Sequence, residues 1–325
     1  MNIDMIHAAA LRSAGHVRRT PFLTSPFLDE IAGRQVFVKP ECLQHTGSFK
    51  YRGARAAISA LSEAGTLGGV IAYSSGNHAQ GVALAARQFG CPAVIIMPAD
   101  APRQKIENTR ALGAETVLYD RSTEDRDAIG AAIAAERGLT LVKPFDDPEV
   151  IAGQGTTGLE IAEQAEEAGI THADVLVCCG GGGLSSGIAL ALEAEAPGLR
   201  VRTVEPAGFD DVARSLRSGR IERNSQSAGN ICDAILTPAP GDLTFPILRR
   251  LCGPGIAVPE HDCLRAMSAA FARLKIVAEP GGAVALAATL YQPEVVTGDA
   301  VIAIVSGGNV DASMFARALS TDPEI

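Results

Sequence analysis

A lysine lies where this chain could carry out chemistry on a carbonyl carbon. Lys50 ends a polar segment that contains Thr46 and Ser48, and it begins a stretch in which apolar residues recur at helical spacing. The two hydroxyls could cap the start of that helix. At a helix N-terminus the dipole and the free N–H groups favour the neutral amine, which is the nucleophilic form. Most lysines are solvated surface residues, so a catalytic role for Lys50 depends on the other motifs of the chain.

Polar or glycine-rich loops follow apolar strands elsewhere in the chain. Residues 74–78, Ser-Ser-Gly-Asn-His, offer hydroxyl and N–H groups that could hold a carboxylate. Residues 180–183 are four successive glycines before a helix, and a backbone without side chains can wrap closely around a phosphate. Residues 306–309, Ser-Gly-Gly-Asn, end a third buried strand. Ligands of an open parallel sheet bind at the carboxyl ends of its strands, so we expect these loops to face one cleft.

The same residues carry a resemblance to a known enzyme family. The chain is similar to the fold-type II pyridoxal-phosphate enzymes, and within them to the threonine/serine dehydratase and serine racemase group. The motifs that carry the resemblance are Thr46-Gly47-Ser48-Phe49-Lys50-x-Arg52-Gly53, Ser74-Ser75-Gly76-Asn77-His78, the four glycines and Ser306-Gly307-Gly308-Asn309. The resemblance extends from about residue 18 to the last helix, and it includes residues 151–156 and the pair Glu279-Pro280.

The resemblance implies how these residues would hold pyridoxal 5'-phosphate. Lys50 would carry the cofactor at rest and, once freed by the substrate's amine, would remove the Cα proton of the substrate. Phe49 would pack beside the cofactor ring, Asn77 would bond its phenolic oxygen, and Ser306 would face its ring nitrogen. The phosphate would lie on the backbone of Gly180, Gly181, Gly182 and Gly183 and on the amide of Leu184.

The resemblance also implies a site for the substrate carboxylate. It would consist of Ser75, Gly76, Asn77 and His78, which supply hydroxyl and backbone N–H groups. Ser75 is a second candidate catalytic residue, because the serine at this position in racemase-like members can exchange a proton on the face opposite the lysine. The hydroxyl of Ser306 cannot keep the ring nitrogen protonated as a carboxylate would, which favours prompt β-elimination over aminotransfer.

The function that the resemblance implies is a β-elimination. A dehydratase, or ammonia-lyase, would convert L-threonine or L-serine into the 2-oxo acid and ammonia, and 3-hydroxyaspartate dehydratase and serine racemase are the alternatives within the class. A second substrate carboxylate would need a cation in the cleft, and Arg126 is the only candidate that the sequence offers, whereas Phe145 would line an apolar wall suited to a methyl group. Outside the class, Glu205 follows the glycines at the distance typical of a dinucleotide site. The G-x-G-x-x-G spacing of such a site fails at Ser185 and Ser186.

Residues 205–211 form an acidic turn that could hold a metal ion. The carboxylates of Glu205 and Asp211 and the backbone carbonyl of Phe209 are the oxygen ligands that Mg²⁺ or Ca²⁺ prefers. These positions match the metal site of serine racemase-like enzymes, so the resemblance implies a bound cation. The alternative is an acidic helix N-cap formed by Asp210 or Asp211.

Apolar runs alternate with helical segments along the chain. Because the runs are continuous rather than alternating, they predict strands buried on both faces, and therefore an α/β protein with mainly parallel sheet. The resemblance implies a tryptophan synthase β-like fold with two domains. A small domain, residues 69–146, would be inserted into a large domain of residues 1–68 and 147–325. The predicted strands lie at residues 70–73, 93–97, 116–119, 139–142, 174–177, 201–204 and 301–305.

The composition favours a cytoplasmic enzyme. A net charge of −9 over 325 residues would repel nucleic acid and acidic membranes, so we expect neither as a partner. No signal pattern or membrane-length apolar run is present. The odd number of cysteines, seven, without a Cys-x-x-Cys pair argues against a disulfide framework and a zinc site. We expect a homodimer that acts on a small amino acid.

Overall fold

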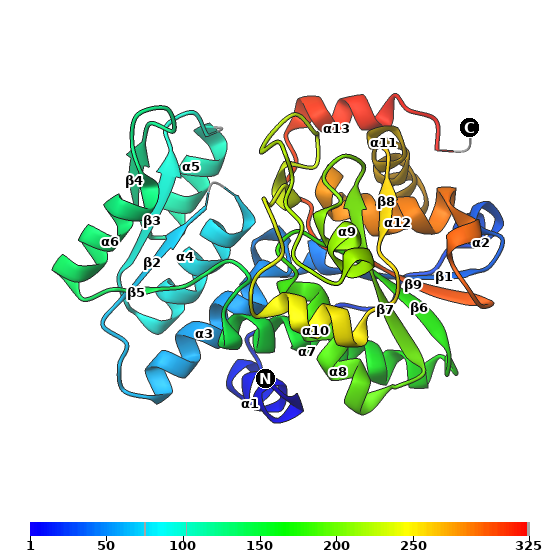
Figure 1. Ribbon diagram of the computed structural model, residues 1–325, viewed down its shortest axis with the longest axis horizontal. Helices are drawn as coiled ribbons and strands as arrows, with labels where there is room; N and C mark the ends of the chain where they lie inside the picture. Colours follow the sequence, from blue (N-terminus) through cyan, green and yellow to red (C-terminus); the bar gives the residue numbers. More distant parts are fainter. Residues whose placement is uncertain (75, 102, 324–325) are drawn as a thin grey trace.

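Two parallel sheets form the framework of the computed structural model, which describes residues 1–74, 76–101 and 103–323 (Figure 1). Each pair of neighbouring strands is parallel. The predicted α/β fold with two mainly parallel sheets is therefore confirmed. The larger sheet has the order β1 (Gln35–Pro40), β9 (Ala300–Val305), β6 (Ala173–Cys178), β7 (Leu199–Pro206) and β8 (Ile256–Val258). The smaller sheet has the order β4 (Glu115–Tyr119), β3 (Ala93–Pro98), β2 (Val70–Tyr73) and β5 (Thr140–Leu141).

Helices cover the sheets on both sides. In Figure 1, α4, α5 and α6 surround the smaller sheet, and α8 and α12 pack against strands of the larger one. None of the described helices is both long and apolar enough to cross a membrane. The helices are α1 (Ile3–Ser13), α2 (Pro26–Ala32), α3 (Lys50–Glu63), α4 (Asn77–Phe89), α5 (Arg103–Ala111), α6 (Arg126–Arg137), α7 (Pro148–Glu167), α8 (Gly183–Glu195), α9 (Asp211–Ser218), α10 (Thr244–Leu251), α11 (Glu260–Ala269), α12 (Pro280–Tyr291) and α13 (Ala312–Leu319).

The central strands are buried on both faces. Every residue of β3, β6 and β9 is buried, as expected for apolar runs between two layers of helices. Cys178 at the end of β6 and Cys179 after it are buried as well, among apolar neighbours. The carboxyl ends of β6, β7 and β9 lie next to one another, because these strands are parallel and β6 pairs with both of the others.

The sequence does not predict β1 or β8. In β1, Lys39 interrupts the apolar pattern, yet its side chain is completely buried. Its Nζ donates hydrogen bonds to Glu160 at 2.6 Å and to Gln164 at 2.9 Å, so α7 supplies the partners that allow this charge into the core. β1 pairs with β9, with Gln35 opposite Ala300 at one end and Pro40 opposite Val305 at the other. This pairing joins parts of the chain that are far apart in the sequence.

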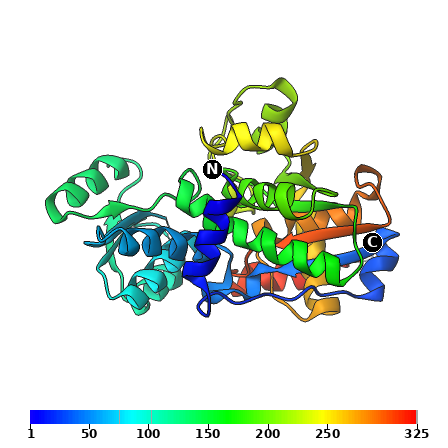
Figure 2. The same cartoon turned by 90° about the horizontal axis from the view of Figure 1, so that it is seen from below.

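Helix α3, which begins at Lys50, is fixed against α7 by two features of the same motif. Arg52 is buried, and its guanidinium forms ion pairs with Glu41 at 2.7 Å and with Glu160 of α7 at 2.7 Å. The next residue, Gly53, allows a close approach, since a Cβ there would lie 2.3 Å from the side chain of Gln154. Helix α1 lies across this junction and packs on α3, α7 and α8 (Figure 2). The position of Lys50 is thus set by buried contacts on the far side of its helix.

Candidate active site

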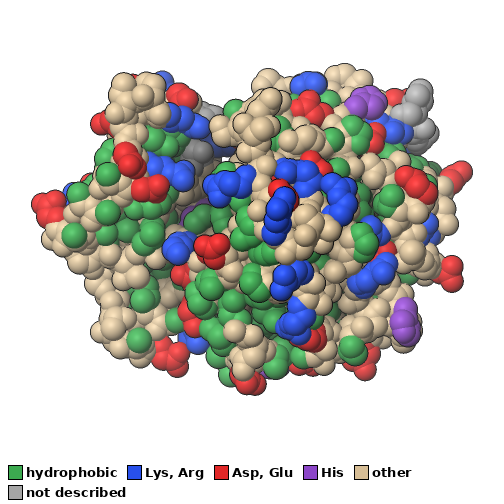
Figure 3. Space-filling model, viewed as in Figure 1, with side chains coloured by type: hydrophobic (Ala, Val, Ile, Leu, Met, Phe, Trp, Pro, Cys, Tyr) green, Lys and Arg blue, Asp and Glu red, His purple; other side chains and the backbone are tan. Residues whose placement is uncertain are grey.

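One cavity, of about 190 Å³, lies at the carboxyl ends of the strands and collects the predicted motifs. Figure 3 shows the surface hollowed between the two lobes, with basic side chains beside the hollow. Ser75 lies outside the described residues. The predicted site residues that line the cavity are Phe49, Lys50, Gly76, Asn77, His78, Gly180, Gly181, Gly182, Gly183, Leu184 and Ser306.

The loop before Lys50 is held by the loop after β9 through backbone contacts. The N–H of Phe49 donates to the carbonyl of Ser306 at 3.0 Å, and the N–H of Gly308 donates to the carbonyl of Gly47 at 2.9 Å. A bridge between Ser48 and Gly307 lies between these bonds. The two loops therefore form one rigid wall that places Ser306 beside Lys50.

The prediction that Thr46 and Ser48 cap α3 is wrong. The N-cap is Phe49, and it makes no side-chain bond to the first turn of the helix. The hydroxyls of Thr46 and Ser48 are buried and have no hydrogen-bond partner among the described residues. These residues pair with the loop after β9 and therefore do not fold back onto the helix.

Lys50 is a partly buried amine in an apolar setting. Its Nζ donates to the carbonyl of Pro144 at 2.7 Å and lies 5.1 Å from the centre of the Phe49 ring. Desolvation lowers the pKa of Lys50 to about 8, and the neighbouring thiol of Cys178 offsets only part of this effect. At neutral to slightly alkaline pH a useful fraction of the side chain is therefore the nucleophilic amine.

Acetylation of the cofactor-free protein should reveal this low pKa. Only the neutral amine reacts with acetic anhydride, so labelling of Lys50, measured by peptide mass spectrometry, is expected to have its midpoint near pH 8. The same lysine in the urea-unfolded protein should have its midpoint near its ordinary pKa of about 10.4. Equal midpoints in the folded and unfolded protein would contradict the desolvation argument.

The glycine loop forms a cradle between β6 and α8. Gly182 is the N-cap of α8 with φ of +92°, a left-handed conformation that glycine adopts without strain. Helix α8 begins at Gly183 with no side-chain cap, so its first N–H groups are available to an anion. A Cβ at Gly181 would lie 2.3 Å from the ring of Phe145, and a Cβ at Gly182 would lie 2.8 Å from Leu248. Larger residues would fill the cradle or displace its walls.

A chain of hydrogen bonds orients Asn77. The Nδ2 of Asn309 donates to the Oδ1 of Asn77 at 2.7 Å, and the Nδ2 of Asn77 donates to Glu279. Burial raises the pKa of Glu279 to about 7, against the bond from Asn77, which lowers it. Glu279 lines the cavity, although the sequence analysis names it only as a landmark of the motif. With both Asn309 and Glu279 in place, the amide of Asn77 has one defined orientation.

His78 contributes no charge to the site. Its Nε2 lies 2.8 Å from the carbonyl of Val142, so this nitrogen carries a proton and donates. Burial, together with the charge of the neighbouring Lys50, lowers the pKa of His78 to about 3. Helix α4 begins at Asn77, with Gly76 as an N-cap that has no side chain. The first N–H groups of α4 point away from the helix body and can bind a carboxylate.

The acidic turn after β7 is built around two buried carboxylates. Glu205 accepts hydrogen bonds from the N–H groups of Val212 at 2.8 Å and Ala213 at 2.7 Å, so it caps α9. Asp210 occupies the N-cap position but makes no side-chain cap bond. Asp211 accepts from Asn224 at 2.6 Å through Oδ1, whereas its buried Oδ2 has no partner among the described residues.

Burial disfavours the charged forms of both carboxylates. Burial raises the pKa of Glu205 well above its ordinary value, and the charge of Asp211 raises it further. Burial likewise raises the pKa of Asp211 to about 6. No group of three or more His, Cys, Asp or Glu side chains is arranged for a metal among the described residues. Phe209 lies between Glu205 and Asp211 in the sequence, and its side chain is buried. Its backbone carbonyl could supply a third oxygen ligand to a cation.

Two residues of the cavity wall, Lys105 and Asp233, are not among the site residues predicted from the sequence. Lys105 of α5 and Asp233 line the cavity and form an ion pair at 3.3 Å. Lys105 comes from a segment without a motif, and only the fold brings it next to Asp233. Phe145, in contrast, is expected from the sequence to line a wall of the site, and it does line the cavity, next to the glycine loop. Arg126, at the start of α6, is exposed, pairs with Asp127 and does not line the cavity.

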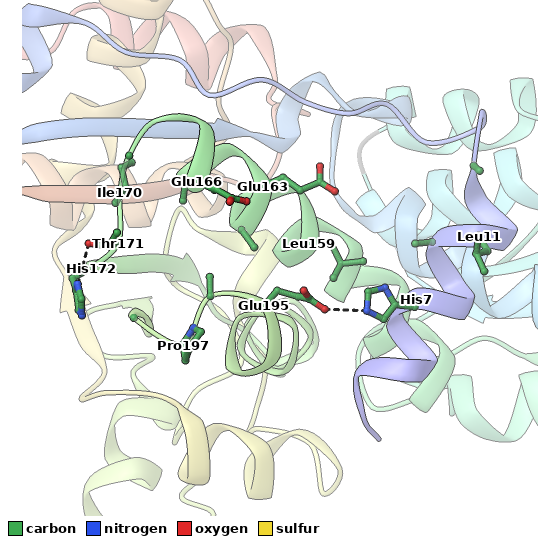
Figure 4. Close-up of a pocket in the computed structure, with 17 residues that line it drawn as sticks. His7, Leu11, Leu159, Glu163, Glu166, Ile170, Thr171, His172, Glu195 and Pro197 are labelled. Carbon is green, nitrogen blue, oxygen red and sulfur yellow. Dashed lines mark hydrogen bonds and ion pairs between the residues drawn. The ribbon is translucent and has the colours of Figure 1, made fainter.

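A larger surface groove, of about 950 Å³, lies elsewhere, between α1, α7 and α8 (Figure 4). His7 and Glu195 pair across it at 3.0 Å. None of the predicted site residues that the structure describes lines this groove. It therefore has no part in the chemistry of Lys50.

The comparison with known proteins identifies the family. Residues 14–307 match the model of the family described as pyridoxal-phosphate dependent enzyme. The chain belongs to this family. Like other pyridoxal-phosphate dependent enzymes, it therefore uses pyridoxal phosphate. The predicted fold type II and the predicted pyridoxal-phosphate cofactor are confirmed. The dinucleotide alternative is wrong, because Glu205 is buried and caps α9 instead of facing a cleft.

Similar proteins in this family act on small amino acids. The chain is 44% identical to the L-threo-3-hydroxyaspartate ammonia-lyase of a Pseudomonas species, over 97% of both chains. It is 39% identical to the serine racemase of Schizosaccharomyces pombe, over 98% of this chain and 97% of the other. The crystal structure of a threonine deaminase from T.th. superposes with a TM-score of 0.90 at 43% identity, covering 96% of this chain and 99% of the other. The predicted membership of the dehydratase and racemase group is confirmed.

Proposed function

We propose that this pyridoxal-phosphate dependent enzyme is an ammonia-lyase that converts a small β-hydroxy amino acid into a 2-oxo acid and ammonia. The observation that carries the proposal is the position of Lys50. Its amine, with a pKa of about 8, shares one cavity with an anion cradle and a helix N-terminus. L-Serine and L-threonine are the first substrates to test, and 3-hydroxyaspartate is the alternative. The names of the similar enzymes support this group of substrates.

The residues of the cavity fit the cofactor. The backbone of residues 180–183 and the first N–H groups of α8 would hold its phosphate, since the cradle has no room for side chains. Phe49 would pack beside the ring, Ser306 would face the ring nitrogen, and Asn77 would donate to the phenolic oxygen. When bound, the cofactor acts as an electron sink that acidifies the Cα–H bond of the substrate.

Lys50 then acts as the base. Its neutral amine takes the proton from Cα, and the electron pair of that bond forms the Cα–Cβ double bond as the Cβ–O bond breaks. The hydroxyl leaves as water with the proton that Lys50 took from Cα. The released enamine then takes a proton from water at Cβ and becomes an imine, and a second water molecule hydrolyses the imine to the 2-oxo acid and ammonia. Atoms and electrons balance without an oxidant or a reductant. The substrate carboxylate would bind the N–H groups of Asn77 and His78 at the start of α4, and that of Gly76, which in the structure donates to Oγ of Ser74 at 3.1 Å.

A substrate panel tests the proposal. The purified holoenzyme is incubated with L- and D-serine, L- and D-threonine and the 3-hydroxyaspartate isomers, and both ammonia and 2-oxo acid are measured. Borohydride treatment should fix the cofactor on Lys50, which peptide mapping would show. Formation of the opposite enantiomer without ammonia would favour the racemase alternative, which requires Ser75, outside the described residues. No ammonia from any substrate would overturn the proposal.

The domain division is proposed as residues 1–68 and 147–325 for the large domain and residues 69–146 for the small domain. The smaller sheet, which lies wholly within residues 70–141, supports this division. Helix α3 contacts both units, because Tyr51 and Ile58 pack in the apolar cluster of the smaller sheet. A homodimer in the cytoplasm is part of the same proposal, and sedimentation of the purified protein tests the oligomeric state.

We further propose that Glu205, Phe209 and Asp211 bind Mg²⁺ or Ca²⁺. The buried Oδ2 of Asp211 has no partner among the residues that the structure describes, and a cation would compensate it and the neighbouring Glu205. Since Glu205 also caps α9, the cation would support the segment that leads away from the glycine loop. It would not contact the substrate.

Removal of the cation is expected to destabilise the protein. A ligand that binds only the folded state adds about 2.7 kcal/mol to the free energy of unfolding when its free concentration is a hundred times Kd. Chelator should therefore lower the melting temperature, and Mg²⁺ or Ca²⁺ should restore it. The Asp211→Asn variant, which keeps the shape of the side chain, should respond to neither. If the parent protein, confirmed to be metal-free by elemental analysis, had the same melting temperature with and without added cation, the turn would be only a helix cap.

A further inference from the structure

Lys105 brings a second ammonium group into the wall of the active-site cavity. It lies on α5, beside the smaller sheet, and its side chain is only 17% exposed. It lines the same cavity as Lys50, Gly76 and Asn77. Within the described part of the chain, Lys50 and Lys105 are the only lysines or arginines that line this cavity. The mechanism above uses Lys50 and leaves Lys105 without a role.

The partner of Lys105 holds it only loosely. Nζ donates to the Oδ2 of Asp233 at 3.3 Å, and the side chain of Asp233 is 66% exposed. An ion pair with such an exposed partner contributes little to stability. An ammonium group has three donors, and no second acceptor for Lys105 occurs among the residues that the structure describes. Another carboxylate could therefore replace Asp233 or join it at little cost.

The charge of Lys105 acts inside the cavity. It lowers the pKa of the buried Glu279, whereas Asp233 raises it. Glu279 accepts a hydrogen bond from Asn77, which begins the carboxylate-binding turn of α4. Lys105 thus faces the space beside the proposed substrate site. The hydroxyl of serine or threonine could accept a hydrogen bond from this ammonium group, but it carries no negative charge to pair with it.

We propose that Lys105 binds a second, distal carboxylate of the substrate, so that the site takes a four-carbon dicarboxylic hydroxy amino acid of the L-threo-3-hydroxyaspartate kind. The inference rests on the proposed function and names the substrate class of that site. A substrate with two carboxylates would meet Asp233 and Glu279 in the cavity wall, and the ammonium group of Lys105 would offset that repulsion. From the sequence, Arg126 is the candidate for the cation that binds a second carboxylate, but Arg126 does not line the cavity. Lys105 lines the cavity and can take that role.

The first test is the specificity of a Lys105→Met variant, which keeps most of the length of the side chain and removes its charge. The measured quantity is the ratio of kcat/KM for L-threo-3-hydroxyaspartate to kcat/KM for L-serine, with the holoenzyme. This ratio is expected to fall at least about tenfold, because a charge-assisted hydrogen bond is lost with one substrate only. Lys143→Met, at an exposed lysine outside the cavity, is the matched control and should keep the parent ratio. A Lys105→Met ratio within twofold of the parent overturns the proposal.

An Asp233→Asn variant separates substrate binding from closure of the cleft. If the ion pair only held the two walls together, Asp233→Asn and Lys105→Met would lower the rates of both substrates alike. If Lys105 binds the distal carboxylate, Asp233→Asn removes a competing anion, and the ratio should equal or exceed that of the parent. Parallel losses in both variants would overturn the proposal.

Inhibition by non-reacting acids gives a readout without turnover of the dicarboxylate. Succinate and butyrate differ by one carboxylate, and both are tested against L-serine. Succinate should inhibit the parent more strongly than butyrate, and the difference should disappear in Lys105→Met. Equal inhibition of the parent by both acids would count against the proposal. Ammonia from L-serine or L-threonine but not from L-threo-3-hydroxyaspartate would refute this inference alone, whereas ammonia from none of them would refute the proposed function.

Discussion

Replacing Lys50 with alanine is expected to lower the release of 2-oxo acid and ammonia by about 10³-fold or more, because the methyl group can neither hold the cofactor nor take the Cα proton. The protein should remain folded. Nζ donates a hydrogen bond to the carbonyl of Pro144, and a lost hydrogen bond of this kind costs about 1 kcal/mol. Removal of a desolvated ammonium group offsets part of that cost.

The experiment compares Lys50→Ala with Lys143→Ala, which removes an exposed lysine outside the cavity. Initial rates, circular dichroism and melting temperature are measured for both. The control should match the parent in every respect. Turnover of Lys50→Ala above roughly one per cent of the parent rate would remove Lys50 from the proton-transfer step.

The second large effect is expected at the glycine loop. Gly182→Asp should weaken cofactor binding by about 100-fold or more, because it places a negative charge beside the phosphate without a compensating partner. The new Cβ would also lie 2.8 Å from Leu248, in a left-handed conformation that side chains rarely adopt. Titration of the cofactor-free protein with pyridoxal phosphate, followed by absorbance, measures the change.

Gly219→Asp is the matched control for backbone strain. Gly219 also has a left-handed φ, +77°, but a Cβ there would meet nothing within 4 Å, and the residue caps the end of α9 away from the cavity. This variant should lose some stability and keep the parent affinity for the cofactor. If both variants bound the cofactor equally well, the four glycines would have another function.

The sequence predicts the site well because short motifs at strand ends carry it. Lys50, Asn77, the four glycines and Ser306 each follow or precede a recognisable strand or helix, and parallel strands bring such loops to one edge. The motif also contains Arg52, whose role becomes clear only in the fold. Its partners, Glu41 and Glu160, lie on other elements. The sequence alone therefore does not distinguish Arg52 from an exposed charged residue.

The errors share a physical cause, which is that distant partners override local patterns. Lys39 makes β1 hard to predict, because a lysine interrupts the apolar pattern of a buried strand. Its charge can be buried only because Glu160 of α7 pairs with it. Thr46 and Ser48 have the residue types of a helix cap, but the loop after β9 competes for this segment. Lys105 belongs to no motif, and the cavity that it lines together with Asp233 exists only when the two sheets are in place. The proposed recognition of a second carboxylate rests on such a pair, so local patterns alone do not reveal it.

The strand order has a consequence for synthesis of the protein. Among the described strands of the larger sheet β9 comes last in the sequence, yet it lies between β1 and β6, which are made earlier. The larger sheet can close only when β9 inserts between them, and the wall that holds Ser306 against Phe49 forms in the same event. Until then the nascent chain carries its lysine without a cofactor pocket and exposes two apolar strand edges. A chaperone that shields these edges until residue 305 has emerged would protect the chain from aggregation at its most vulnerable stage.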